Sequence, residues 1–303
     1  MNKKNEINYL SKIIKPDVGI ITNISYAHIK NFKNIKEIAL AKSEIIQNIK
    51  DNGHLVLNAD DYFYDFHRKI ASKRKLNIIS FSIKNKSSNI YLNLIRKQKL
   101  KYKISISINN LKKNFYLNTC FESDVKNLLS SIAIISVYKD INKLNCNFFY
   151  NHKIPTGRGD ISKIRLFNKS FYLVDHSYNS NPLSLNSALK NFNMIKVANS
   201  KKHLVLGDML ELGKYSKKLH MEIGKSINKT SLKNINVIGE HVKWTFSTLN
   251  KNKRGIIIKN KFQIIDLIKN CLNNNDYLMI KGSNSTGLNS LTNQIKTGKI
   301  HAL

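Results

Sequence analysis

Polar segments suited to binding metal ions, phosphate groups and amines follow several apolar runs in this sequence. The first of these segments includes His28, and Lys42 follows it on the next predicted helix. The other segments span residues 58–61, 175–181, 207–213 and 281–285. Imidazole and carboxylate groups bind metal ions, and Lys and Arg side chains bind phosphate. Segments of this kind recur more often than in ordinary solvated loops, so the sequence predicts an active site.

Hydrophobic periodicity predicts the elements that position these segments in the first half of the chain. Apolar, β-branched runs predict buried strands, and a spacing near 3.6 residues predicts helices. The predicted strands are 18–24, 54–57, 77–83, 91–95, 104–108 and 115–117, and the predicted helices are 34–49, 62–73 and 124–138, the last capped by Ser123.

The second half has a different pattern of predicted elements, in which strands alternate with helices. The predicted strands are 161–167, 171–175, 204–206, 237–238, 256–258 and 277–280, and the predicted helices are 183–195, 216–228, 241–250, 261–272 and 287–296. This alternation indicates βαβ units around a parallel sheet. Because open parallel sheets bind ligands at the carboxyl ends of their strands, we expect the polar segments to line a cleft between two α/β domains. The domain boundary is predicted near residues 152–156.

The composition is strongly basic. Compositional drift of the genome towards AT-rich codons explains this basicity better than a function in binding nucleic acid does. Lys and Arg total 51 against 19 Asp and Glu, which gives a formal net charge of +32 in a chain of 303 residues. Lys accounts for 45 of the 51, and Ile and Asn number 42 each. All three amino acids have AT-rich codons. Lys is spread along the whole chain, Arg is scarce and no nucleic-acid-binding motif is present, so we expect no nucleic-acid partner.

Simple features exclude other classes of protein. No segment approaches 18 uninterrupted apolar residues, so no transmembrane helix is predicted. The first residues contain no apolar core of a secretory signal. Cys120, Cys146 and Cys271 are far apart and odd in number, which excludes a disulfide framework and a metal knuckle. We expect a cytoplasmic protein.

Ordered strings of residues in both halves resemble the Mur ligase family. PDVGIITNISYAHIKNF, AKSEI (which contains Lys42) and LNADD resemble the central domain of the family. Gly157-Arg158, DHSYNSNP, GDMLELG and KGS resemble its C-terminal domain in the same order. The SYN-x-NP and GDMLELG strings resemble one branch in particular, which adds D-alanyl-D-alanine to UDP-N-acetylmuramoyl-tripeptide.

The resemblance implies a fold and an activity. The fold would be α/β, with an incomplete central, ATP-binding domain over residues 1–152 and a Rossmann-like C-terminal domain over residues 153–303. The activity would be that of an amide-forming ligase in peptidoglycan precursor synthesis. ATP would phosphorylate a substrate carboxylate, and the amine of D-alanyl-D-alanine would displace phosphate from the acyl phosphate. Such chemistry concentrates negative charge on phosphoryl oxygens and needs cations and metal ions rather than a protein nucleophile.

The resemblance also implies roles for Lys42 and His28. Lys42 would carry a carbamate formed from CO₂, which turns a cation into an anion that helps to hold Mg²⁺. The alternative is one more surface Lys among 45. His28 would be a ligand of a Mg²⁺ ion, although Mg²⁺ prefers oxygen ligands. The alternative for His28 is an ordinary hydrogen-bonded loop residue.

Seven further residues are assigned to ligands by the same resemblance. Arg158 offers a planar, permanently charged donor set that suits phosphate. The alternative role of Arg158 is that of a partner in a surface ion pair. The alternative for Asn127 is an ordinary polar residue in the middle of a helix. The residues predicted to bind ATP are Asn127, Arg158, Asp175 and His176, and those predicted to bind substrate are Asn179, Lys281 and Ser283.

Two local departures from the family pattern weaken parts of this assignment. His176 stands where the family has an acidic residue before Ser-Tyr-Asn, and imidazole cannot replace both acceptor oxygens of a carboxylate. The family string H-N-x-x-N reads Ser-Asp-Val-Lys-Asn over residues 123–127.

A larger departure is that the sequence contains no phosphate loop. The stretch from Gly207 to Tyr215 has five residues between its glycines and a Tyr where Ser or Thr must stand, so it does not qualify. The resemblance starts in the middle of the central domain, which leaves a sheet edge to be covered. Two hypotheses follow: a separate chain supplies the UDP-sugar domain and the phosphate loop, or the protein is a truncated remnant without catalysis.

Overall fold

The computed structural model describes residues 1–299, and the chain divides into two compact units after Lys153. Unit 1 spans Met1–Lys153, and unit 2 begins at Ile154. Each unit is built around one six-stranded sheet. The predicted α/β fold with parallel sheets is therefore confirmed. No helix within residues 1–299 is long and apolar enough to cross a membrane.

Unit 1 contains a mixed sheet in the order β1-β2-β3-β4-β5-β6, in which β1 to β4 are parallel neighbours and β4 to β6 are antiparallel. The strands are β1 (Val18–Ile21), β2 (His54–Asn58), β3 (Asn77–Ser82), β4 (Ile90–Gln98), β5 (Lys101–Ile108) and β6 (Leu111–Leu117). The helices are α1 (Glu6–Ile14), α2 (Ile35–Asn48), α3 (Tyr64–Lys73) and α4 (Glu122–Tyr138), with short 3₁₀ turns at η1 (Ile29–Asn31) and η2 (Ile141–Lys143).

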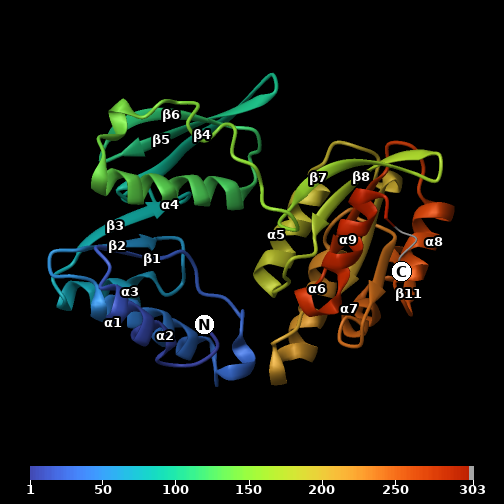
Figure 1. Cartoon of the computed structure of the whole chain (residues 1–303), viewed down its shortest axis with the longest axis horizontal. Helices are drawn as coiled ribbons and strands as arrows, with labels where there is room; N and C mark the ends of the chain where they lie inside the picture. Colours follow the sequence, from blue (N-terminus) through green and yellow to red (C-terminus); the bar gives the residue numbers. More distant parts are fainter. Residues whose placement is uncertain (300–303) are drawn as a thin grey trace. The chain divides into compact units, whose positions relative to one another are not determined.

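The sheet of unit 1 curves around α4, while α1, α2 and α3 lie on the other side of β1 to β3 (Figure 1). The apolar face of α4, with Leu129 and Ile132 fully buried, packs against side chains from five of the strands. Burial of each such side chain contributes about 1.5–3 kcal/mol. The core of unit 1 therefore fixes the strands whose carboxyl ends carry the predicted site.

Unit 2 contains a sheet in the order β11-β10-β9-β12-β8-β7, parallel except for β7. Its strands are β7 (Asp160–Leu166), β8 (Lys169–His176), β9 (Lys202–Gly207), β10 (Ile235–Ile238), β11 (Arg254–Ile258) and β12 (Tyr277–Lys281). Its helices are α5 (Pro182–Asn193), α6 (Ser216–Asn228), α7 (Lys243–Thr248), α8 (Phe262–Cys271) and α9 (Leu288–Thr297). The apolar residues of α8 and α9 share one core with β7, β8, β9, β11 and β12. In this sheet β12, the last strand within residues 1–299, lies between β8 and β9.

Three local predictions differ from the structure. The strand predicted over 18–24 ends at Ile21, because side chains of other segments take over the backbone hydrogen bonds beyond it. The predicted cap Ser123 is wrong, since α4 begins at Glu122 and its N-cap residue is Phe121. Helix α1 was not predicted, although its apolar residues recur at helical spacing.

The segment that follows β8 ends in a strong helix cap. The Asn181 side chain accepts a hydrogen bond from Ser184 N at 2.9 Å, and the Ser184 hydroxyl accepts one from Asn181 N at 3.1 Å. Pro182 occupies the first helical position, where its missing N–H costs nothing. This capping box fixes where β8 gives way to α5.

We expect Asn181→Ala to lower the free energy of unfolding of unit 2 by about 1 kcal/mol, because it leaves the first backbone N–H groups of α5 without their side-chain partner. Asn186→Ala, an exposed position inside the same helix, is the matched control and should cause no loss. Urea unfolding followed by circular dichroism measures both. Equal stability of the two variants would contradict the assigned cap.

Candidate active site

In unit 1, the segment that follows β1 is fixed by side chains from the end of β2. Asn58 Nδ2 donates to Thr22 O at 2.9 Å, and Asp61 Oδ2 accepts from Ile24 N at 2.7 Å. Asp61 Oδ1 also accepts from Phe63 N at 2.9 Å. The polar residues after two neighbouring parallel strands therefore form one structure, as expected for the carboxyl edge of a sheet.

Lys42 reaches this segment from α2. Its Nζ donates to Asn23 O at 2.8 Å, and its side chain is half-buried. Burial lowers the pKa of Lys42, and the nearby negative charge of Asp61 opposes that effect. The predicted role of Lys42 as a carbamate stays a prediction, and the sequence prediction assigned no role to Asp61.

His28 lies further along the same segment, just before the turn η1. Its φ of 61° is in the left-handed region, which is uncommon for a residue other than Gly and is fixed here by the turn that follows. Within residues 1–299, no group of three or more His, Cys, Asp or Glu side chains is arranged to hold a metal ion. A Mg²⁺ site at this edge would therefore need oxygen ligands beyond these side chains, and a carbamate on Lys42 is a donor of the preferred kind.

His67 is a buried neighbour of this edge that the sequence prediction missed. It lies on α3, is 1% exposed, and its Nε2 is 3.1 Å from Ala39 O on α2. Burial lowers the pKa of His67, with opposing contributions from the hydrogen bond to Ala39 and the charge of Asp61. A single His in a helix without a recognisable string gives no sequence signal for this position.

In unit 2, Arg158 sits in a tight turn between two glycines. Gly157 N donates to Asp160 Oδ1 at 2.7 Å, and Gly159 N donates to Asp175 O at 2.6 Å. Gly159 has φ of 108°, and a Cβ there would come within 2.7 Å of the His176 ring, so the position requires Gly. The guanidinium of the exposed Arg158 lies 4.4 Å from the centre of the Tyr178 ring, a cation–π distance.

Asp175 is fully buried at the end of β8, and both of its oxygens are engaged. Oδ1 accepts from Ser177 N at 2.9 Å and from Ser177 Oγ at 2.6 Å. Oδ2 forms an ion pair with Lys296 Nζ at 2.5 Å. These bonds tie the segment after β8 to α9, and the predicted contact of Asp175 with ATP stays a prediction.

His176 and Lys281 are direct neighbours on the parallel strands β8 and β12. Burial, and to a smaller extent the charge of Lys281, lower the pKa of His176 to about 3 against the opposing charge of Asp175. Burial lowers the pKa of Lys281 to about 7. Lys281 Nζ donates to Asn179 O at 2.9 Å. The structure therefore brings three predicted residues, His176, Asn179 and Lys281, to one edge of the sheet.

Ser283 joins this edge to the 207–213 segment. Its Oγ accepts from Leu210 N at 2.9 Å and donates to Ser180 O at 3.3 Å, while Ser283 N donates to Asp208 O at 3.0 Å. His220 on α6 accepts from Met209 N through Nε2 at 3.2 Å. The 207–213 segment is thus a rigid loop rather than a phosphate loop.

Asn127 belongs to the other unit. It is exposed on α4 in unit 1, whereas Arg158 and the other residues predicted to bind nucleotide belong to unit 2. Asn127 O accepts from Ser130 Oγ at 2.9 Å inside the helix. Its predicted contact with ATP stays a prediction.

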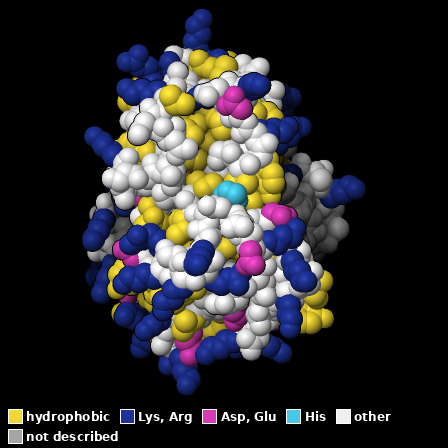
Figure 2. Space-filling view, turned by 90° about the vertical axis from the view of Figure 1, so that its left-hand side faces the viewer, with side chains coloured by type: hydrophobic (Ala, Val, Ile, Leu, Met, Phe, Trp, Pro, Cys, Tyr) yellow, Lys and Arg dark blue, Asp and Glu magenta, His cyan; other side chains and the backbone are white. Residues whose placement is uncertain are grey.

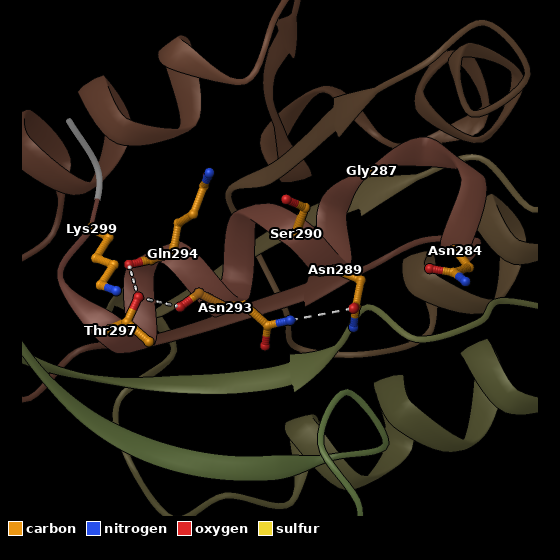
Figure 3. Close-up of a pocket in the computed structure, with 8 residues that line it drawn as sticks. All are labelled: Asn284, Gly287, Asn289, Ser290, Asn293, Gln294, Thr297 and Lys299. Carbon is orange, nitrogen blue, oxygen red and sulfur yellow. Dashed lines mark hydrogen bonds between the residues drawn. The ribbon is translucent and has the colours of Figure 1, made fainter. Parts of the chain in front are cut away.

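A polar groove of about 510 Å³ runs along α9 in unit 2 and contains none of the predicted site residues. Figure 3 shows amide and hydroxyl side chains of α9 projecting along it, with Asn293 bonded to Asn289 at 3.5 Å. The residues that line it are Asn284, Gly287, Asn289, Ser290, Asn293, Gln294, Thr297 and Lys299.

Two family models match the chain, one in each unit. The model described as Mur ligase middle domain matches residues 1–135, and the model described as Mur ligase, glutamate ligase domain matches residues 164–284. The chain belongs to the Mur ligase family. The predicted resemblance to the middle and C-terminal domains of this family is therefore confirmed.

Named relatives of the chain are ligases that carry one and the same name. It is 29% identical, over 96% of its length, to UDP-N-acetylmuramoyl-tripeptide--D-alanyl-D-alanine ligase of Rickettsia prowazekii. It is 28% identical, over 97% of its length, to the ligase of the same name from Buchnera aphidicola subsp. Baizongia pistaciae. The chain spans 64% and 62% of these two relatives.

Solved Mur ligases share the fold. MurF from Acinetobacter baumannii superimposes with a TM-score of 0.84 at 22% identity, covering 98% of this chain and 63% of that one. MurF from Thermotoga maritima, solved in complex with ADP, gives 0.82 at 21% identity, covering 98% of this chain and 65% of that one. Both units thus have the fold of the corresponding parts of these ligases.

The His176–Lys281 pair gives a testable ionisation behaviour. Because the folded pKa of His176 is about 3, its ring should show no titration step between pH 5 and 8 in nuclear magnetic resonance spectra, whereas the urea-unfolded chain titrates near about 6.5. The unfolded state then binds the proton more strongly, so His176 makes unit 2 less stable as pH falls from about 6.5 towards 3. Lys281→Met removes the neighbouring cation and should raise the pKa of His176. A step between pH 5 and 8 in the folded wild-type protein would refute this assignment.

Proposed function

We propose that the chain forms part of an ATP-dependent ligase that adds D-alanyl-D-alanine to UDP-N-acetylmuramoyl-tripeptide in the cytoplasm. The reaction would pass through an acyl phosphate on the tripeptide carboxylate. Polypeptide from outside these 303 residues would supply the UDP-sugar domain and the phosphate loop.

One observation carries the choice of this reaction among those of Mur ligases. The relatives that align over 95–97% of the chain, from Rickettsia, two Buchnera strains, Haemophilus and Borreliella, all carry the name UDP-N-acetylmuramoyl-tripeptide--D-alanyl-D-alanine ligase. The alignments therefore include both the unit that contains Lys42 and the unit that contains Lys281.

The residues of unit 2 offer the positive charge that such a reaction needs. Arg158 presents a rigidly mounted guanidinium that suits a phosphoryl oxygen. Lys281, with a pKa of about 7, exchanges its proton near neutral pH at the same edge of the sheet. When the dipeptide amine attacks the acyl phosphate, the C–N bond forms, the C–O bond to phosphate breaks, and the amine loses a proton. A nearby amine with this pKa is suited to stabilise or accept that proton.

Unit 1 would contribute the metal-binding side of the reaction. A bound Mg²⁺ would neutralise charge on the phosphates of ATP. Lys42, as a carbamate, and His28 are the residues that we propose as its protein ligands. The lowered pKa of Lys42 favours the uncharged amine, which is the form that reacts with CO₂.

Two features of unit 1 support a polypeptide partner. Within residues 1–299, β1 pairs only with β2, so its other edge presents unpaired backbone groups. Helix α1 exposes four large apolar side chains on one stripe, namely Tyr9 (67%), Leu10 (56%), Ile13 (65%) and Ile14 (70%). We propose that the chain that carries the phosphate loop adds a strand beside β1 and covers this stripe.

The alternative function is that of a truncated, non-catalytic remnant. The observation that favours it is the substitution of His176 for an acidic residue. The pKa of about 3 keeps His176 neutral at physiological pH, so it cannot offer a negative charge there.

The catalytic proposal predicts phosphate release in a reconstituted pair. The chain, combined with a polypeptide that carries a Mur ligase UDP-sugar domain and phosphate loop, should release phosphate only when ATP, the tripeptide substrate and D-alanyl-D-alanine are all present. Lys42→Met should lower the rate by at least about 100-fold, since it removes a charged group that acts at the phosphates. Lys36→Met, an exposed Lys on the same helix, is the control and should leave the rate unchanged. Absence of release in the wild-type pair would favour the remnant.

The partner surface makes a separate prediction. Ile13→Asp places a charge in the apolar stripe of α1 and should weaken association with that polypeptide by about tenfold or more, because burying an unpaired charge is unfavourable. Leu100→Asp changes an equally apolar residue that is 88% exposed in the turn between β4 and β5, and should have no effect. Size-exclusion chromatography and calorimetry of the mixture measure the difference. Equal affinity of the two variants would rule out α1 as the contact.

A further inference from the structure

Two carboxylates face each other where β7 begins and β8 ends. Asp160 and Asp175 are direct partners in the antiparallel register of these strands. Like charges directly opposite one another destabilise a strand pair. Asp175 is fully buried, so its charge also lacks the stabilisation that water provides.

Lys296, near the end of α9, lies against both carboxylates. Its Nζ is 2.6 Å from Asp160 Oδ2 and 2.5 Å from Asp175 Oδ2, and its side chain is 15% exposed. Burial acts against the charge of Lys296, but the hydrogen bonds and negative charges of Asp160 and Asp175 outweigh it and raise its pKa. The three groups therefore form one ion network with a fixed geometry.

This network holds both ends of the turn that carries Arg158. Asp160 accepts from Gly157 N through its other oxygen at 2.7 Å. The backbone oxygen of Asp175 accepts from Gly159 N at 2.6 Å. A third bond, from Tyr178 N to Gly157 O at 3.1 Å, places the turn beside the ring that the Arg158 guanidinium covers.

We propose that Lys296 is the positioning residue for Arg158: by neutralising Asp160 and Asp175 together, it keeps the Gly157–Gly159 turn in the geometry that presents the guanidinium to a phosphate. Lys296 acts on the turn through the two carboxylates that it contacts. The link to phosphate rests on the proposed function, whereas the link from Lys296 to the turn does not.

Removal of Lys296 acts on the turn through simple electrostatics. Lys296→Met would leave two facing carboxylates without a cation, one of them fully buried. Either Asp175 takes up a proton or β7 separates from β8, and each change alters the bonds at Gly157 and Gly159. Lys296→Arg retains the charge and can bind both carboxylates. Lys299→Met removes an exposed Lys from the end of the same segment and is the matched control.

The first arm of the test is amide hydrogen exchange of the 303-residue chain. We expect Lys296→Met to speed exchange at Gly157 and Gly159 by at least about tenfold relative to wild type, with α6 amides unchanged. Lys296→Arg should restore most of the protection, and Lys299→Met should match wild type. Exchange that accelerates equally in the turn and in α6 would reduce Lys296 to a general stabiliser and overturn the proposal.

The second arm measures phosphate binding, with inorganic pyrophosphate and ATP as the probes and the Arg158 side-chain resonance as the readout. Lys296→Met should weaken binding by about tenfold, the loss expected when one charge-assisted contact is misplaced. Unchanged affinity would overturn the positioning role. If the wild-type Arg158 resonance does not respond to either probe, the proposed role of Arg158 fails, while the exchange arm still decides the role of Lys296.

Asp160→Asn tests the same connection, from the ion network to the Gly157–Gly159 turn, if Lys296→Met does not fold. This variant keeps the Lys296–Asp175 pair but weakens the acceptor of Gly157 N. We expect faster exchange at Gly157 and little change at Gly159, which is bonded to Asp175 O. Unchanged exchange at Gly157 would overturn the proposed connection.

Discussion

A backbone that leaves a parallel sheet loses the hydrogen-bond partners that the neighbouring strands supplied, and buried backbone groups cannot stay without partners. In unit 1, Asn58 and Asp61 bind the backbone of the segment after β1. In unit 2, Asp175 binds Ser177 N, and Asp208 binds Glu240 N and Val242 N at 3.1 and 2.7 Å. The same side chains that satisfy the backbone also shape the edge at which ligands bind open sheets. For this reason changes of these acids at the strand ends affect structure and chemistry together.

The number of Lys and Arg residues in this protein says little about its function. The chemistry of each Lys depends instead on the groups around it. Lys and Arg side chains are scattered over the face seen in Figure 2, with apolar groups between them, and they form no single stripe. Such a distribution does not match the clustered charge of nucleic-acid-binding surfaces. Five Lys residues differ from the rest: burial lowers the pKa of Lys42, Lys202, Lys253 and Lys281, whereas two carboxylates raise that of Lys296. The acidity of one amine type thus varies from position to position, as desolvation and the nearest charges dictate.

Much of the fold followed from periodicity, and the exceptions have physical causes. The alternation of strands and helices in the second half predicted every strand of unit 2, because buried parallel strands need continuous apolar runs and their helices need one apolar face. The early end of β1 could not be predicted, since it depends on Asn58 and Asp61, which lie more than 30 residues away. Lys296 carried no sequence signal, because one Lys among 45 becomes distinctive only when its carboxylate partners are known. The strings around Lys42 and Lys281 were recognisable because their residue types stand out from the Lys-, Ile- and Asn-rich sequence around them.

Helix α1, which was not predicted from the sequence, shows that an amphipathic helix need not bury its apolar stripe within its own unit. Its residues do form an amphipathic helix, but the apolar stripe of Leu10 and Ile13 faces outward. The helix is attached to α2 by polar contacts instead: Glu44 accepts from the backbone of Asn5 and Asn8 at 2.7 and 3.0 Å, and Asn48 donates to Ser11 Oγ at 2.9 Å. Polar contacts fix the position of a helix but bury little apolar area, so they contribute little of the stabilisation that usually justifies an amphipathic stripe. The apolar stripe of α1 therefore adds little to the stability of unit 1, and burial against further polypeptide would supply the stabilisation that it lacks.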